Sequence, residues 1–375
     1  MPNDTAWTLV TDARALNTLA DKLARHKLLA VDTESNSLHA FREQVCLIQF
    51  SSEEDYLVDP LALDGLASLG PLFANPGIEK IFHAAEYDLM VLQRDYGFEF
   101  ANLFDTMLAA RILGRKRVGL GNMLEEEFGI KLAKKFQRAD WGKRPLSKAM
   151  QDYARLDTHY LIELRHKLKS ELEQSGRWPL AEEDFKRLPH TVLQPPDQDH
   201  SDIWRIKGAY KMGRPERAIL QKLAQYRAHK AEQLDVPLFK VMGDSTLSAI
   251  AEARPNSLDD LQGIPGMSPG QIKRHGKAIL RAVAEGAHAA APERPKRGPY
   301  NEAYAERLEA LREWRKRAAR RVELESDVVL PRDLMESVAQ ANPRSAEALA
   351  ELLATVPYRL ARYGDQILKA VRQAG

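Results

Sequence analysis

The stretch Leu28-Leu29-Ala30-Val31-Asp32-Thr33-Glu34 has the pattern of an apolar β-strand that ends in two carboxylates. Successive side chains of a strand point to opposite faces, so Asp32 and Glu34 lie on the same face. Two carboxylates in that arrangement can share a metal ion. An ordinary solvated strand end is the alternative interpretation of this short pattern taken alone.

Further strand-like runs flank this stretch, with helical patterns between them as far as about residue 165. They cover residues 7–10, 28–33, 45–50, 56–59 and 80–83. Several of them precede residue 59 with only short turns between them, which favours a mixed or partly antiparallel sheet. We therefore predict an α/β domain and expect a Rossmann fold to fit poorly.

The chain has 375 residues, which is enough for two or three domains. Strand signals fade after about residue 170, and proline-rich breaks occur near 188–201 and 286–300. We predict a first domain at 1–190, a linker at 191–200, a helical domain at 201–286, a linker at 287–300 and a second helical domain at 301–375.

The two helical domains repeat one another with a constant offset of 88 positions. Pro255 corresponds to Pro343 and Ser257 to Ser345, and the segment 274–276 corresponds to 362–364. A constant offset over many positions indicates two copies of one small helical module. The second copy is the more divergent.

The composition is that of a globular protein, with 44% hydrophobic and 29% charged residues. No apolar run is long enough for a membrane span, and no basic-then-apolar leader follows Met1, so we expect a cytoplasmic location. The single cysteine, Cys46, lies in an apolar run and is expected to be a buried thiol. A net charge of +2 means that any nucleic-acid surface must come from local clustering.

Two further motifs carry chemistry. His83-Ala84-Ala85-Glu86-Tyr87-Asp88-Leu89 follows a strand and opens a helix, with Asp88 near the helix start. Tyr153-Ala154-Arg155-Leu156-Asp157 lies in a helix expected to begin after Ser147, which places Tyr153 and Asp157 one turn apart on one face. Taken singly, each motif is also compatible with a helix cap or a solvated helix face.

In this order, the three motifs resemble those of the DEDDy exonucleases with a ribonuclease H-like fold. The segments 104–106, 136–141 and 144–146 are similar to ribonuclease D-like catalytic domains, and the resemblance covers most of 28–172. The second motif has His83 where many relatives have Asn. The third motif carries a tyrosine, Tyr153, and this residue type defines the DEDDy subclass of these exonucleases.

The resemblance implies a hydrolytic 3′→5′ exonuclease with two divalent ions, Mg²⁺ or Mn²⁺. Asp32, Glu34 and Asp157 would hold the ion on the nucleophile side, Asp32 would bridge to the second ion, and Asp88 would support that ion through water. Tyr153 would orient the attacking water. The chemistry agrees, because two carboxylates about 4 Å apart repel by roughly 4 kcal/mol at an effective dielectric near 20, and hard cations remove that repulsion.

The repeated modules resemble HRDC domains, which commonly contact nucleic acid, and we predict RNA contacts in two basic regions. The catalytic part has a cluster between residues 113 and 146, and the second module has a basic helix around Trp314. A solvated face balanced by nearby glutamates is the alternative for any single cation. The predicted RNA-binding residues are Arg115, Lys116, Arg117, Lys134, Lys135, Arg138, Lys143, Arg144, Arg315 and Arg317.

The resulting hypothesis is an exoribonuclease that releases nucleoside 5′-monophosphates, in the 3′ processing of tRNA and other small structured RNA. A DNA 3′→5′ exonuclease is one alternative, because the acidic centre does not itself read the 2′-hydroxyl. A catalytically silent RNA-binding adaptor and a protein scaffold built on the helical repeats are others. No P-loop is present, so ATP is not expected, and a monomer is adequate.

Overall fold

The computed structural model describes residues 7–191, 199–295 and 301–374. Contacts within the chain divide these residues into two units. One unit holds 7–35, 45–191 and 301–374, and the other holds 36–44 and 199–295. Much of the two predicted linkers, 191–200 and 287–300, lies outside the described residues.

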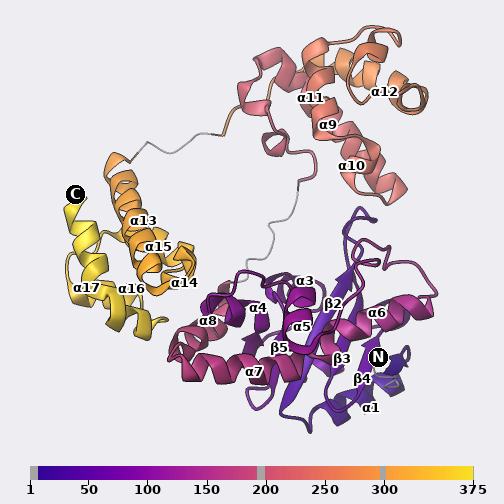
Figure 1. Cartoon of the computed structure of the whole chain (residues 1–375). Helices are drawn as coiled ribbons and strands as arrows, with labels where there is room; N and C mark the ends of the chain where they lie inside the picture. Colours follow the sequence, from indigo (N-terminus) through magenta and orange to yellow (C-terminus); the bar gives the residue numbers. More distant parts are fainter. Residues whose placement is uncertain (1–6, 192–198, 296–300, 375) are drawn as a thin grey trace. The chain divides into compact units, whose positions relative to one another are not determined.

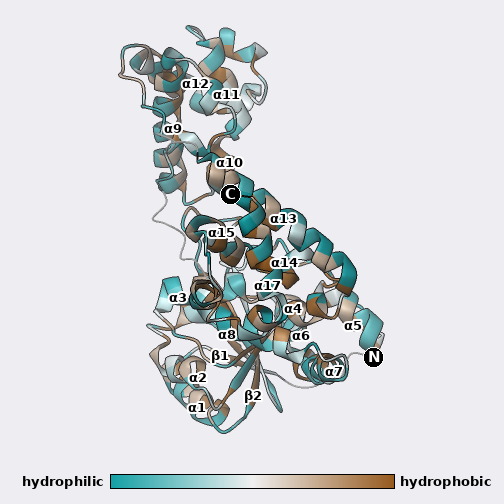
Figure 2. Ribbon diagram, turned by 90° about the vertical axis from the view of Figure 1, so that its left-hand side faces the viewer, coloured by the Kyte–Doolittle hydropathy of each residue, from teal (hydrophilic) through white to brown (hydrophobic). Residues whose placement is uncertain are grey.

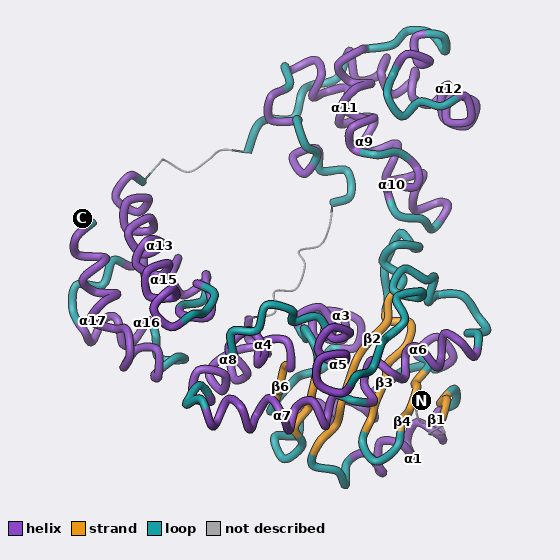
Figure 3. The backbone as a smooth tube through the Cα atoms, viewed as in Figure 1, coloured by secondary structure: helices purple, strands orange, loops and turns teal. Residues whose placement is uncertain are grey.

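A six-stranded mixed sheet forms the centre of the first unit (Figures 1 and 3). Its strands lie in the order β1-β4-β3-β2-β5-β6; β2–β3 and β3–β4 pair antiparallel, and the other neighbours pair parallel. The predicted mixed sheet is thus confirmed. The strands are β1 (Trp7–Val10), β2 (Leu28–Ser35), β3 (Val45–Ser51), β4 (Asp55–Val58), β5 (Glu79–Phe82) and β6 (Leu103–Asp105).

Helices cover both faces of this sheet. Leu29 and Val31 of β2 pack into a core with the first three helices, whereas Ala30 packs with the later ones. Asp32 and Glu34 continue the alternation of Ala30. The helices are α1 (Ala13–Leu23), α2 (Gly70–Ala74), α3 (Glu86–Tyr96), α4 (Thr106–Ile112), α5 (Leu120–Phe128), α6 (Lys148–His159), α7 (Leu161–Gln174) and α8 (Trp178–Thr191), with short 3-10 turns at Pro60–Ala62 and Ala67–Leu69.

The internal repeat predicted from the sequence is confirmed by the helix bounds. A shift of 88 residues carries the bounds of α9, α10 and α11 onto those of α13, α14 and α15. The first module consists of α9 (Arg214–Leu234), α10 (Leu238–Val241), α11 (Asp244–Ala253) and α12 (Pro269–Ala287), with 3-10 turns at Ile203–Arg205, Ala209–Lys211 and Asp260–Gly263. The second consists of α13 (Glu302–Val322), α14 (Ser326–Val329), α15 (Arg332–Ala341), α16 (Ala346–Leu352) and α17 (Pro357–Gln373).

The second module packs against α8 within the first unit. The fully buried Arg359 of α17 forms ion pairs with Glu183 and Asp184 of α8, at 2.9 and 2.8 Å. Val328 joins the same apolar cluster as residues of α4, α7 and α8. In the described part of the chain, no helix is long and apolar enough to cross a membrane.

Candidate active site

Asp32 and Glu34 project from one face of β2 toward α6. The strand is fixed by its register with β3, in which Asp32 lies opposite Gln49 and Glu34 opposite Leu47. Leu29, Ala30 and Val31 before them are fully buried, so the core holds the strand while its end carries the two acids. Both carboxylates keep partial exposure.

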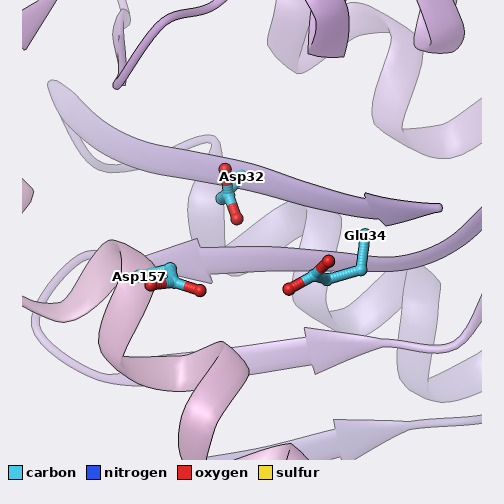
Figure 4. A group of neighbouring side chains, drawn as sticks. All are labelled: Asp32, Glu34 and Asp157. Atoms are coloured by element: carbon cyan, nitrogen blue, oxygen red, sulfur yellow. The ribbon is translucent and has the colours of Figure 1, made fainter. Parts of the chain in front are cut away.

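Asp157 approaches the same point from α6 (Figure 4). The helix begins as expected after Ser147, whose hydroxyl accepts the backbone N–H of Met150. One carboxylate oxygen from each of Asp32, Glu34 and Asp157 lies within 4.8 Å of the others, the only such group of potential metal ligands in the described residues. Two residues from a strand and one from a helix therefore form one acidic cluster.

Asp88 lies beside this cluster, in the first turn of α3. It is 6% exposed, and its Oδ1 accepts hydrogen bonds from the backbone N–H and the hydroxyl of Thr33, at 3.1 and 2.5 Å. Thr33 stands between Asp32 and Glu34, so Asp88 is anchored to the strand that bears both. It does not belong to the group of three within 4.8 Å.

The loop before Asp88 is held by Asp105, at the end of β6. The Asp105 carboxylate accepts the backbone N–H groups of Ala84 and Ala85, and also those of Met107 and Leu108 at the start of α4. Ala84 has a positive φ of 65°, a strained conformation for a residue other than glycine. One carboxylate thus caps α4 and sets the entry of α3.

The electrostatics of the cluster favour a divalent cation. Burial, together with the negative charges of Asp88, Asp157 and Glu34, raises the pKa of Asp32 well above its usual range. Burial also raises the pKa of Asp157 to about 7, and that of Asp88 to about 7 despite the hydrogen bonds from Thr33. A set of hard oxygen donors with excess negative charge fits Mg²⁺ or Mn²⁺.

Tyr153 lies next to the acids and packs between two aromatic rings. Its ring centroid is 5.7 Å from that of Phe136 and 6.1 Å from that of Trp141. Burial first, and then the charges of the neighbouring acids, raise the pKa of Tyr153 above its ordinary value. The phenol therefore keeps its proton at neutral pH and can donate or accept a hydrogen bond.

The predicted RNA-binding cations fall into two groups. Several are engaged within the protein: Arg115 pairs with Glu127 and Glu171, Arg144 with Asp59, and Arg315 donates to the carbonyl of Leu330. Arg117 pairs with Glu126, and Lys143 with Asp140. Exposed and without an ion pair among the described residues are Lys116, Lys134, Lys135 and Arg317, while Arg138 is exposed and has a partner.

Exposed cations on α12 were not singled out from the sequence. Lys273, Lys277 and Arg281 follow one another at intervals of four residues, without an ion pair in the part of the chain that the structure describes. An offset of 88 brings these positions to Ala361, Asp365 and Lys369, so the second module lacks this stripe. Comparison of the two repeats was the signal that could have identified it. The second module has a largely hydrophilic helix, α13 (Figure 2), whose exposed cations are Arg312, Lys316, Arg317, Arg320 and Arg321.

Comparisons with known proteins identify the family of both kinds of domain. A 3′-5′ exonuclease family model matches residues 7–173, and an HRDC domain model matches residues 216–283 and 305–371. Ribonuclease D of Escherichia coli K12 is 32% identical over 283 residues, which cover 74% of each protein. The chain belongs to the ribonuclease D family. The predicted enzyme class, a hydrolytic 3′→5′ exoribonuclease, is thereby confirmed.

Two further comparisons concern a solved structure and a yeast relative. The crystal structure of E. coli RNase D, described as an exoribonuclease involved in structured RNA processing, matches with a TM-score of 0.68 and 26% identity, over 96% of this chain and all of that one. The Saccharomyces cerevisiae exosome complex exonuclease RRP6 is 32% identical over 302 residues, 76% of this chain. The chain spans only 41% of that protein. The ranges matched by the family models lie within the three predicted domains, whose boundaries stay predictions.

Proposed function

We propose that this protein shortens structured RNA from the 3′ end and releases nucleoside 5′-monophosphates, with tRNA precursors and other small structured RNAs as substrates. The observation that carries the proposal is the cluster of Asp32, Glu34 and Asp157, with Asp88 and Tyr153 beside it. The similarity to ribonuclease D supports RNA as the substrate class. We further propose a monomer that acts in the cytoplasm without ATP.

The acids would hold two divalent ions. By family resemblance, Asp32, Glu34 and Asp157 would hold the first, and Asp32 and Asp88 would serve the second. Such ions, when bound, stabilise the charge that develops on the attacking and leaving oxygens of the phosphodiester. The role of the protein is to aim its carboxylates at one point, which β2 and α6 do from two sides, while a bound cation would favour their ionised form.

Tyr153 would orient the attacking water. Its raised pKa makes it a poor proton acceptor at neutral pH, whereas its hydroxyl can hold a water in a fixed direction. Phe136 and Trp141 restrict the ring, so the direction of the hydroxyl is set before substrate arrives.

RNA would be held by exposed cations near the site and on the helical modules. Lys135 lies over the ring of Phe136, which itself contacts Tyr153, so cationic charge is present at the edge of the site. Exposed Lys and Arg side chains bind phosphates through charge and do not distinguish between base sequences. The stripe on α12 would add contacts along the backbone.

The test is a timed digestion of 3′-extended tRNA labelled at its 5′ end, with Mg²⁺ or Mn²⁺ and with a chelator. We expect stepwise shortening only when a metal ion is present. The Asp32→Ala variant should fold normally, because a partly exposed acid contributes little to the core, yet lose at least about 10³-fold in kcat since one of the ion-binding carboxylates is missing.

Digestion of a DNA of the same sequence distinguishes an exoribonuclease from a DNA 3′→5′ exonuclease. Equal rates on RNA and DNA would mean that the protein is a general 3′→5′ exonuclease and not an exoribonuclease. Binding of RNA without shortening would favour the adaptor. An Asp32→Ala protein as active as the wild type would refute the assignment of the acidic cluster.

A further inference from the structure

The position of α6 determines the shape of the acidic cluster. Asp32 and Glu34 are fixed by the backbone hydrogen bonds of the β2–β3 pair. Asp157 and Tyr153 lie on a helix, whose backbone hydrogen bonds are internal and fix nothing relative to the sheet. Whatever attaches α6 to the sheet therefore sets the separation between the two halves of the cluster.

Asp55 makes one such attachment, beside the apolar cluster that α6 shares with β3 and β4 and the hydrogen bond from Trp7 to Asp152. It is the first residue of β4, is 4% exposed, and receives two donors from α6: Nη1 of Arg155 at 3.1 Å and Nδ1 of His159 at 2.7 Å, both on Oδ2. Its other oxygen, Oδ1, accepts the hydroxyl of Ser51 at 2.6 Å. A buried carboxylate with three donors is held in one direction.

A second link runs parallel to the first. The Thr158 hydroxyl, on α6, lies 2.7 Å from the Ser51 hydroxyl on β3. Ser51 pairs with Asp55 across β3–β4 and with Ala30 across β3–β2. The network thus connects α6 through β3 to the strand that carries Asp32 and Glu34.

The network lies on the side of α6 away from the acids. Arg155 stands midway between Tyr153 and Asp157 in the sequence, and two residues along a helix correspond to a rotation of about 200°. Thr158 and His159 follow it on that side. Asp55 therefore acts on the active site through α6 and touches no reacting atom.

We propose that Asp55 is a positioning residue, which through Arg155, Thr158 and His159 orients α6 so that Asp157 and Tyr153 meet Asp32 and Glu34. This inference rests on the proposed function. Productive geometry tolerates only about 0.5 Å of displacement, and a displacement of about 1 Å can lower a rate by about 10²-fold. Loosening α6 should therefore lower kcat and weaken metal binding while leaving RNA binding intact.

The chain offers a matched control. Glu79 on β5 accepts two hydrogen bonds from Arg165 on α7, at 2.5 and 2.9 Å, with side-chain exposures of 15% and 10%. This pair also joins a helix to the sheet and is well shielded from solvent. Among the described residues, neither partner forms a hydrogen bond with the network around Asp55. Glu79→Gln therefore measures the effect of losing an ion pair of this kind without a change at α6.

The experiment compares the full-length wild type, Asp55→Asn and Glu79→Gln. Three quantities are measured: kcat and KM on 3′-extended tRNA, Mn²⁺ binding by calorimetry without RNA, and thermal stability. We expect Asp55→Asn to lose about tenfold or more in kcat. Its KM should stay within about twofold, and its Mn²⁺ affinity should fall several-fold. Glu79→Gln should lose stability only.

Other outcomes overturn the proposal. If Asp55→Asn keeps wild-type kcat and Mn²⁺ affinity, or if both variants lose activity in proportion to stability, Asp55 has no positioning role. If Asp55→Asn fails to fold, the isosteric Thr158→Val variant is used to test the same positioning role by the same criteria. Its expected loss is smaller, about threefold in kcat. An inactive wild type would instead contradict the proposed function, and the Mn²⁺ measurement would still test the position of α6.

Discussion

Asp32 lies among three other carboxylates. In the absence of a cation, the repulsion between these groups destabilises the folded protein. Burial and like charge hold the pKa values of Asp32 and Glu34 well above their usual range. Asp88 and Asp157, with pKa values of about 7, keep their protons at a pH where an unfolded aspartate has lost its own. The crowded acids therefore lower the stability of the metal-free protein and raise the affinity of the site for a cation.

This destabilisation predicts a pH dependence of stability. A carboxyl group whose folded pKa exceeds its unfolded value stabilises the folded state while protonated, and that contribution is lost as the pH rises through the folded pKa. Between about pH 4 and pH 7, the metal-free protein should therefore lose at least about 2 kcal/mol at this site, since one pKa unit corresponds to about 1.4 kcal/mol. Urea denaturation in a chelator across this range measures the loss.

Asp157→Asn provides the control for this measurement. It removes one titrating group and one charge, so its stability should fall less between pH 4 and pH 7 than that of the wild type. Addition of Mn²⁺ near pH 8 should restore the stability of the wild type and have a smaller effect on the variant. Parallel pH profiles for the two proteins would contradict the assignment.

At the scale of elements, the starts of α3 and α4 depend on one carboxylate. Asp105 accepts four backbone N–H groups, two in the Ala84–Ala85 turn and two at the start of α4. Because Ala84 is held at positive φ, the turn that leads to Asp88 would relax without these bonds.

Asp105→Ala should therefore lower both stability and activity. Loss of a cap and of further buried acceptors should cost about 3 kcal/mol in the free energy of unfolding. Asp105→Asn keeps one oxygen for Ala84, Met107 and Leu108 and should cost less. Chemical denaturation gives the stabilities, and kcat on tRNA gives the effect on Asp88. Wild-type stability in Asp105→Ala would show that the cap is dispensable.

Elements could be predicted where their signals are local. The alternation in 28–34, the cap at Ser147 and the 88-residue repeat each lie within a short window or a fixed offset, and β2, α6 and the helical modules were predicted from them. The strand β6 was missed because it has only three residues. The anchors of the site could not be found in this way, because Asp55 and Arg155 are 100 residues apart and meet only in the fold.

At the scale of the whole molecule, the second helical module shares a core with the exonuclease domain in one unit. Arg359, which is fully buried, bonds to Glu183 and Asp184 and to the carbonyl oxygens of Val328 and Leu180. Burial raises the pKa of both acids, and the guanidinium opposes that effect. Two acids of α8 therefore depend on an arginine from a helix about 175 residues away.

Replacement of Arg359 by methionine should consequently destabilise the catalytic unit. The variant fills the space but leaves Glu183 without its cation and Asp184 with only Arg187, at 3.9 Å. Removal of one partner from a buried ion pair typically costs about 3–5 kcal/mol. Arg332→Met, which removes the solvent-exposed pair with Glu336 from the same module, should cost at most about 1 kcal/mol. Chemical denaturation followed by tryptophan fluorescence measures both. Equal effects of the two substitutions would show that the buried ion pair does not hold the second module against α8. The second module would then not contribute to the stability of the catalytic domain.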